Sequence, residues 1–264
     1  MKTIKLNDHK QLDQVPGRRL GAGERFSFRC HPGVACFNRC CRNLNLFLQP
    51  YDAMRLKNCL RISSDAFIDA HVDVVLREGA HFPEVLLRMA DDVEKTCPFL
   101  TDAGCSVYAH RPDTCRTFPV EHGLWHDDRS GRPEPVYYFR PPDFCLGQHE
   151  DQQLTIEAWI EDQQAGAYHR MTRRWGAVRQ LFAQNPWGSE GPDGPRAKMA
   201  FMAAYNIDRF KAFVFESSFL RRYKIKSALL KKVQRDDEAL LMLGFEWIRF
   251  FVGGLPSKQI RLRR

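Results

Sequence analysis

The stretch 28–44 reads FRCHPGVACFNRCCRNL and holds four of the nine cysteines in this 264-residue chain. Cys30, Cys36, Cys40 and Cys41 follow the spacing C-x5-C-x3-C-C. A single cysteine usually behaves as a small buried hydrophobic residue. Four thiols in one short segment instead indicate metal ligation or thiol chemistry.

Further cysteines follow in CPFLTDAGCSVYAHRPDTCRTFP (97–119) and in FCLG (144–147). The N-terminal segment lacks the apolar core of an export signal, and no apolar run approaches the roughly 20 residues that span a bilayer. We therefore expect a soluble cytoplasmic protein, in which a disulfide framework is disfavoured. The predicted metal ligands are Cys30, Cys36, Cys40, Cys41, Cys97, Cys105, Cys115 and Cys145.

The spacing of these cysteines narrows the choice of metal centre. No C-x2-C pair occurs in the chain, so paired zinc knuckles and bacterial ferredoxin motifs are absent. Neighbouring side chains diverge in strands and most loops, so Cys40 and Cys41 do not easily share one ion. The pair argues for a multinuclear cluster or for two centres, and eight cysteines suffice for two four-thiolate sites. Cys59, among leucines in an expected helix, is interpreted as an inert buried thiol.

Cationic residues surround the cysteines. Arginines near thiolates lower thiolate pKa values and offset the charge of an anionic cluster, although surface arginines paired with carboxylates are the ordinary alternative. The five arginines are Arg29, Arg39, Arg42, Arg111 and Arg116. Histidine ligands suit zinc or mononuclear iron, but we select none of His31, His110 and His149, because each is more typical of a surface or supporting position.

Local patterns predict a short strand over 44–50, a helix over 51–60 that begins at Pro50, and a second helix capped by Ser63 or Ser64 that carries Phe67 through Leu76. A strand is expected over 83–89. A hairpin turns at Asp102–Gly104, and a short helix follows Pro112.

These elements predict an α+β fold that is mainly helical. A small cysteine-rich metal-binding core with short hairpins would pack against a C-terminal helical extension. We expect an irregular N-terminal entry over 1–25, the metal-binding domain over 26–150 and the basic helical extension over 151–264.

The formal net charge of +8 comes mainly from the C-terminal part, for example RRYKIK at 221–226 and RLRR at 261–264. A basic stripe can bind phosphates, but a solvated helix face is the more common explanation. No standard nucleic-acid-binding motif is present. We therefore expect neither nucleic acid nor a membrane as a partner, and a protein or redox partner stays open.

The second cysteine block, together with the CC pair and the L-x-P-x-D segment before a helix, resembles the YkgJ-like cysteine-cluster family. The resemblance covers about residues 26–147 and departs from the commoner CxxCGxCC form in its first block. It implies zinc or iron chelation or an iron–sulfur cluster, with Tyr108, Arg111 and Arg116 beside the ligands. The residues that carry it are Cys40, Cys41, Pro50, Asp52, Cys97, Pro98, Cys105, Tyr108, Arg111, Pro112, Cys115, Arg116 and Pro119.

Three functions follow as hypotheses. The first is an iron–sulfur protein, of [4Fe–4S] type, with a redox or electron-transfer role. The second is a zinc-chelating structural or interaction protein, and mononuclear or dinuclear iron is a further choice of metal. The third is a protein-lysine methylase, because flagellin lysine methylases look related through a similar cysteine cluster. The sequence does not decide whether the chain is an enzyme.

Overall fold

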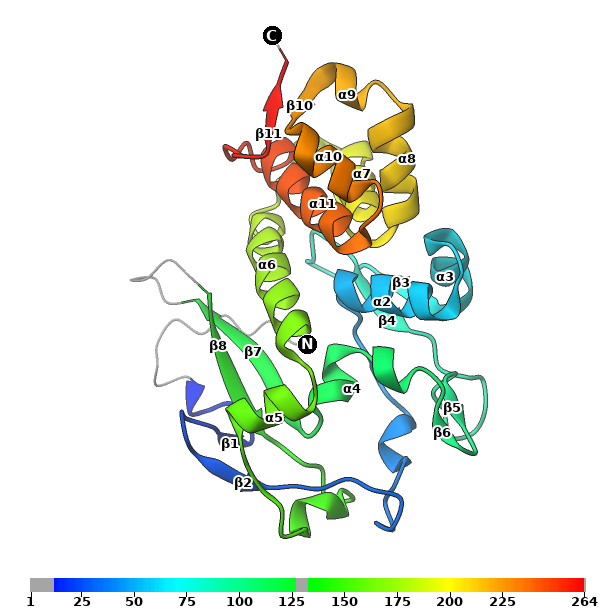
Figure 1. Ribbon diagram of the computed structural model, residues 1–264, viewed down its shortest axis with the longest axis vertical. Coiled ribbons are helices and arrows are strands. Elements are labelled where there is room, and N and C mark those ends of the chain that lie inside the picture. Colours follow the sequence, from blue (N-terminus) through cyan, green and yellow to red (C-terminus); the bar gives the residue numbers. More distant parts are fainter. Residues whose placement is uncertain (1–11, 127–132, 264) are drawn as a thin grey trace. The chain divides into compact units, whose positions relative to one another are not determined.

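The computed structural model describes residues 12–126 and 133–263 (Figure 1). Contacts divide the chain into two compact units, each made of two segments. The first, called the cysteine unit here, comprises Met1–Phe47 and Arg88–Arg173. The second, called the helical unit, comprises Leu48–Leu87 and Arg174–Arg264.

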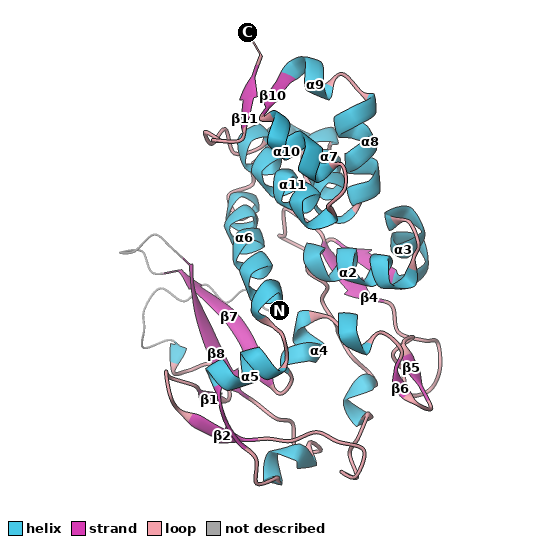
Figure 2. Cartoon of the chain, in the orientation of Figure 1, coloured by secondary structure: helices cyan, strands magenta, loops and turns pink. Residues whose placement is uncertain are grey.

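Helices predominate and the strands are short and antiparallel, so the mainly helical α+β class is confirmed (Figure 2). Within the described residues no helix has the length and apolar character needed to cross a membrane.

The cysteine unit is built mostly from short elements and loops. Its elements are β1 (Arg18–Arg19), β2 (Arg25–Ser27), the 3-10 helix η1 (Arg39–Cys41), β5 (Leu100–Thr101), β6 (Gly104–Cys105), η2 (Tyr108–His110), α4 (Asp113–Thr117), β7 (Val120–His126), β8 (Pro133–Phe139), η3 (Leu146–His149), β9 (Gln153–Thr155) and α5 (Ile156–Asp162). Helix α6 (Gly166–Phe182) begins in this unit, and the chain passes to the helical unit between Arg173 and Arg174.

A three-stranded antiparallel sheet, in the order β1-β8-β7, forms the largest regular part of the cysteine unit. Residues 136–139, which read VYYF, form the second half of β8. Strand β2 pairs separately with β9, where Phe26 lies opposite Leu154. These pairings bring residues near the N-terminus beside residues more than a hundred positions later.

A hydrophobic core fills the space between these strands and α5. Trp159 packs edge-on against both Phe26 and Phe28, and its indole N–H donates to the carbonyl of Thr117 at 3.0 Å. Cys145 belongs to this core with an exposed fraction of 4%. The cysteine-bearing loops are therefore anchored on an apolar base, because one of their cysteines is part of it.

The helical unit contains the longer helices of the C-terminal part together with an earlier segment. Its elements are α2 (Pro50–Leu60), α3 (Ser64–His71), β3 (Val72–Val75), β4 (Glu84–Leu87), η4 (Gly188–Glu190), α7 (Pro195–Tyr205), α8 (Ile207–Glu216), α9 (Phe219–Arg222), β10 (Tyr223–Ile225), α10 (Ser227–Val233), α11 (Asp237–Phe251) and β11 (Ile260–Leu262).

Local signals explain where α2 and α3 begin. Pro50 opens α2, and the Gln49 backbone N–H donates to the Asp52 carboxylate at 2.8 Å in a capping box. The Ser63 hydroxyl accepts the Ala66 N–H and caps α3. Both predicted helix starts are confirmed.

Two local predictions were wrong. Residues 44–50 form no strand: Leu46 and Leu48 are buried as the alternation predicts, but the backbone pairs only through a bridge at Phe47 and a 2.8 Å hydrogen bond from the Leu48 N–H to the Val85 carbonyl. The second helix ends at His71, and Val72–Val75 form β3 instead, paired with β4. The β-branched run VDVV favours a strand once a partner is present.

Helix α11 is the centre of the helical unit and packs against α7, α8 and α10, as Figure 1 shows. Trp247, on α11, is fully buried and contacts the rings of Phe210, Phe213 and Phe219. Aromatic residues at helical spacing in α8 and α9 therefore form the core of this unit together with Trp247.

Candidate metal centre

All eight predicted ligand cysteines lie in the cysteine unit, whereas Cys59 lies in α2 of the helical unit. All nine are free thiols, and Cys59 is only partly buried. The eight occupy loops and ends of short elements: Cys30 after β2, Cys36 before η1, Cys40 and Cys41 in η1, Cys97 before β5, Cys105 in β6, Cys115 in α4 and Cys145 before η3.

Four of these cysteines, which we call the pocket set, line one pocket: Cys30, Cys36, Cys40 and Cys145. The rest of the wall is almost entirely apolar. It consists of Phe28, Val34, Phe118, Phe144 and Gly147. Cys30 is exposed and Cys145 is buried, so the four thiols extend from the surface to the core.

Backbone contacts hold the two segments of the pocket set together. The Arg29 N–H donates to the Gly147 carbonyl at 3.0 Å, and the Leu146 N–H donates to Cys36 Sγ at 3.2 Å. A Cβ atom at Gly147 would lie 2.6 Å from the Arg29 carbonyl oxygen. Glycine is therefore required for Cys145 and its loop to approach Cys30 this closely.

The other four cysteines, Cys41, Cys97, Cys105 and Cys115, are called the hairpin set because they surround the β5–β6 hairpin and α4. The Cys97 N–H donates to the Cys41 carbonyl at 2.9 Å, and Cys105 pairs with Leu100 across the hairpin. Burial raises the pKa of Cys97 to about 11, with smaller contributions from Cys41 and Cys105. The predicted hairpin and helix are confirmed here, and both carry ligand candidates.

Cys40 and Cys41 join the two sets. Their side chains contact each other, contrary to the expected divergence, and both lie in η1. The hydrogen bond between them, with burial and thiol repulsion, raises the pKa of Cys40. The same hydrogen bond lowers the pKa of Cys41 to about 7, against the effect of burial. Cys41 is therefore predisposed to the thiolate form that binds metals.

Comparison with known proteins agrees with this geometry. Residues 29–146 match the model of a family described as "CxxCxxCC: Putative zinc- or iron-chelating domain". This segment is therefore similar to that family of cysteine-cluster domains. The match includes all eight cysteines of the two sets. No curated protein and no solved structure matches the chain.

The two buried arginines of the cysteine-cluster segment make no ion pair with a carboxylate among the described residues. Arg111 donates to the Tyr108 carbonyl and the Gln163 side chain, both at 2.6 Å. Arg116 donates to the Gln163 carbonyl at 2.6 Å and to the Ala109 carbonyl at 2.8 Å. Burial lowers the pKa of Arg111, and the nearby Cys115 and Cys105 counteract that effect. Arg111 therefore lies within electrostatic range of the hairpin set.

The remaining predicted neighbours have simpler surroundings. Tyr108 is exposed, and its ring stacks under the Arg111 guanidinium at 3.8 Å. Arg42 donates to Glu94 at 2.9 Å, which is the ordinary surface pairing. His31 uses both ring nitrogens, one with Glu150 and one with the Gly33 N–H.

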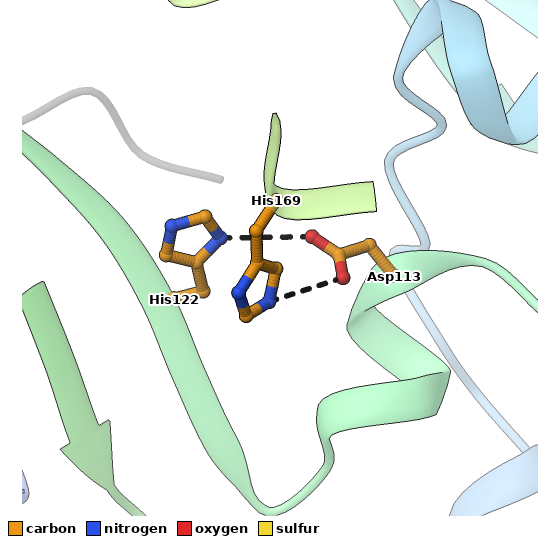
Figure 3. Close-up of side chains that lie close together, drawn as sticks. All are labelled: Asp113, His122 and His169. Carbon is orange, nitrogen blue, oxygen red and sulfur yellow. Dashed lines mark ion pairs between the residues drawn. The ribbon is translucent and has the colours of Figure 1, made fainter. Parts of the chain in front are cut away.

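One buried polar cluster of the cysteine unit was missed from the sequence. Asp113 of α4, His122 of β7 and His169 of α6 converge, as Figure 3 shows. Burial would raise the pKa of Asp113, but the two imidazoles lower it to about 2. Burial lowers the pKa of His122. The sequence offered one signal for this cluster, the Asp113 carboxylate inside the RPDTC motif. His122 and His169 lie far apart in the chain, and neither belongs to a motif that points to a metal site.

Proposed function

We propose that the cysteine-cluster domain binds an iron–sulfur cluster of the [4Fe–4S] type through the pocket set. The observation that carries the proposal is the convergence of Cys30, Cys36, Cys40 and Cys145 on one apolar-walled pocket. Four cysteine thiolates are the usual ligands of such a cluster. An apolar wall limits solvent access and tunes the reduction potential.

The spacing of the sulfur atoms supports a multinuclear centre. Four sulfurs around a single zinc ion, each about 2.3 Å from it, lie roughly 3.8 Å apart. Among the described residues, which include every cysteine, no three sulfurs lie within 4.8 Å of one another. Thiolates bound to different irons of one cluster are farther apart, because the irons and sulfides lie between them.

The charge of the surroundings also supports an anionic centre. Arg111 and Arg116 are buried at exposed fractions of 9% and 3%. A buried cation without an anionic partner is costly. Thiolates of the hairpin set, or a cluster that they help to bind, would supply the missing negative charge next to Arg111.

The hairpin set provides four further thiolates and is the place for a second centre. We propose that it binds a second metal centre, and the description of the family model names zinc and iron. A bound iron–sulfur cluster would supply one-electron transfer. We therefore propose a redox role with a protein partner, and the reducing cytoplasm as the compartment in which free thiols persist.

The test is metal and sulfide analysis of protein purified without oxygen. Wild-type protein should be brown and contain iron and acid-labile sulfide. Cys30→Ser and Cys145→Ser should each lose the iron and sulfide of the pocket cluster, about four of each per chain, whereas Cys59→Ser, the matched control in the helical unit, should retain them. A colourless wild-type protein that contains zinc and no sulfide would overturn the proposal.

The same analysis separates the two sets. If Cys97→Ser and Cys105→Ser lose the cluster while Cys30→Ser and Cys145→Ser retain it, the cluster belongs to the hairpin set. That result would overturn the assignment to the pocket. Electron paramagnetic resonance of the reduced protein then reports the cluster type.

A further inference from the structure

We propose that Asp113, His122 and His169 form a second kind of metal site, which binds a divalent first-row transition ion through nitrogen and oxygen. Their ligand atoms all lie within 4.8 Å of one another, and all three residues are buried. It is the one group of three such residues with this spacing in the part of the chain that the structure describes. The site is independent of the thiolate sets, because no cysteine belongs to it.

The distances between the donor atoms fit coordination of one metal ion. His122 Nδ1 lies 3.6 Å from one carboxylate oxygen of Asp113, and His169 Nε2 lies 3.4 Å from the other. Figure 3 shows both imidazoles directed at the carboxylate from different elements. Charge-assisted hydrogen bonds are shorter, about 2.7–2.9 Å. Donors bound to one zinc ion at about 2.0–2.2 Å would lie roughly 3.3–3.6 Å apart.

The burial of the histidines is the second, independent observation. The side chains of His122 and His169 are 3% and 7% exposed. Both ring nitrogens of His122 and the Nε2 atom of His169 lack a hydrogen-bond partner among the described residues. Leaving a buried polar atom unsatisfied costs about 1–3 kcal/mol. A metal ion would satisfy one nitrogen of each ring at once.

Tyr137 gives His169 the support that a ligand histidine usually has. Its hydroxyl lies 3.3 Å from His169 Nδ1, the ring nitrogen that faces away from Asp113. A hydrogen bond at Nδ1 fixes the ring and leaves the Nε2 lone pair for a metal. Tyr137 also stacks on His122, with ring centroids 5.2 Å apart, and so orients both imidazoles.

Helix α4 separates this site from the thiolates. Asp113 and Cys115 are two residues apart on the helix, so their side chains project about 200° apart around its axis. One short helix therefore presents a carboxylate to one site and a thiol to another. Two imidazoles and a carboxylate suit zinc or ferrous iron, whereas the thiolates suit an iron–sulfur cluster or zinc.

The test compares cobalt binding by the wild-type chain and by a His122→Asn/His169→Gln double variant, after removal of bound metals. We expect the variant to bind one cobalt ion fewer per chain, with unchanged sulfur-to-cobalt charge-transfer absorption. Equal cobalt contents would overturn the proposal and leave the cluster as a metal-free polar network. His71→Asn, a histidine of α3 in the helical unit, is the matched control and should bind as the wild type does.

A variant that fails to fold does not end the test. X-ray absorption at the zinc edge of zinc-loaded wild-type protein should show imidazole scattering. A shell of sulfur alone would overturn the site. Failure of the iron–sulfur proposal would instead appear as the absence of acid-labile sulfide from the purified protein. The two failures can therefore be distinguished.

Discussion

Gly244 shows how strongly a single residue can constrain the packing of the helical unit. A Cβ atom at this position of α11 would lie 2.3 Å from the Ala203 carbonyl oxygen of α7. The α7 backbone cannot move aside as a flexible side chain can. The two helices would therefore have to separate. The close approach of α11 and α7 therefore depends on the missing side chain.

We expect Gly244→Ala to lower the free energy of unfolding by about 1–3 kcal/mol, because overpacking outweighs the better helix propensity of alanine. Urea denaturation measures the change. Gly166→Ala in α6 is the control, since its Cβ would meet only the Arg170 side chain at 3.6 Å. A Gly244→Ala protein as stable as wild type would contradict the close packing.

The residue scale also shows where sequence reasoning about the site succeeded and failed. Eight cysteines could be selected because their clustering is visible in the chain, and all eight lie in one unit. His122 and His169 could not be selected, because only the fold brings α4, β7 and α6 together. The contact between Cys40 and Cys41 was not indicated by the sequence pattern, which predicted divergent side chains.

At the scale of elements, a polar network joins four helices of the helical unit. Lys57 of α2 lies 3.0 Å from Asp208 of α8 and 3.6 Å from Asp237 of α11. Asp208 also accepts the backbone N–H of Ser64, the first residue of α3, at 2.7 Å. Burial would raise the pKa of Asp208, but the Ser64 N–H and the Lys57 ammonium hold it below the ordinary value.

This lowered pKa predicts a dependence of stability on pH. The unfolded carboxyl titrates near 3.9, so its stabilising effect is complete above about pH 4 and is lost as the pH falls through the lower folded value. The destabilisation caused by Asp208→Asn should be largest above pH 5 and shrink below pH 4. Chemical denaturation across that range measures it.

The control for this experiment is Glu216→Gln, an exposed carboxylate at the end of α8. Its effect on stability should be small at every pH. A constant difference between Asp208→Asn and wild type at all pH values would refute the depressed pKa.

Elements with local signals were predictable, and elements that need a distant partner were not. The caps of α2 and α3 and the turn before Gly104 lie within a few residues of the structure they specify. The pairing of β2 with β9 depends on residues more than a hundred positions apart. The strand expected over 44–50 is reduced to a single bridge at Phe47 and one hydrogen bond from the Leu48 N–H to the Val85 carbonyl of β4.

At the scale of the whole molecule, the two units differ in what stabilises them. The cysteine-bearing loops contain elements of only two to five residues, such as β5, β6 and α4. The helical unit has long helices with fully buried aromatic residues, such as Trp247. Bound metal should therefore contribute to the order of the cysteine unit far more than to that of the helical unit.

We expect that removing bound metal with a chelator accelerates amide hydrogen exchange across residues 36–41 and 97–105. Helices α7 and α11 should keep their protection against exchange. Mass spectrometry of the full chain, followed by metal reconstitution as the control, measures both regions together. Equal acceleration in α11 would show that metal supports the whole chain, and no change near the cysteines would argue against metal binding there.

The division into units also bears on how the family segment can be isolated. Residues 48–87 lie inside the matched region 29–146, yet they belong to the helical unit. Their helices α2 and α3 pack on α7, α8 and α11, which come from beyond the match. A fragment trimmed to residues 29–146 would retain all eight cysteines of the two sets and lack the helices α7, α8 and α11 on which α2 and α3 pack. The segment that matches the family model and the compact units of the fold therefore have different boundaries in this chain.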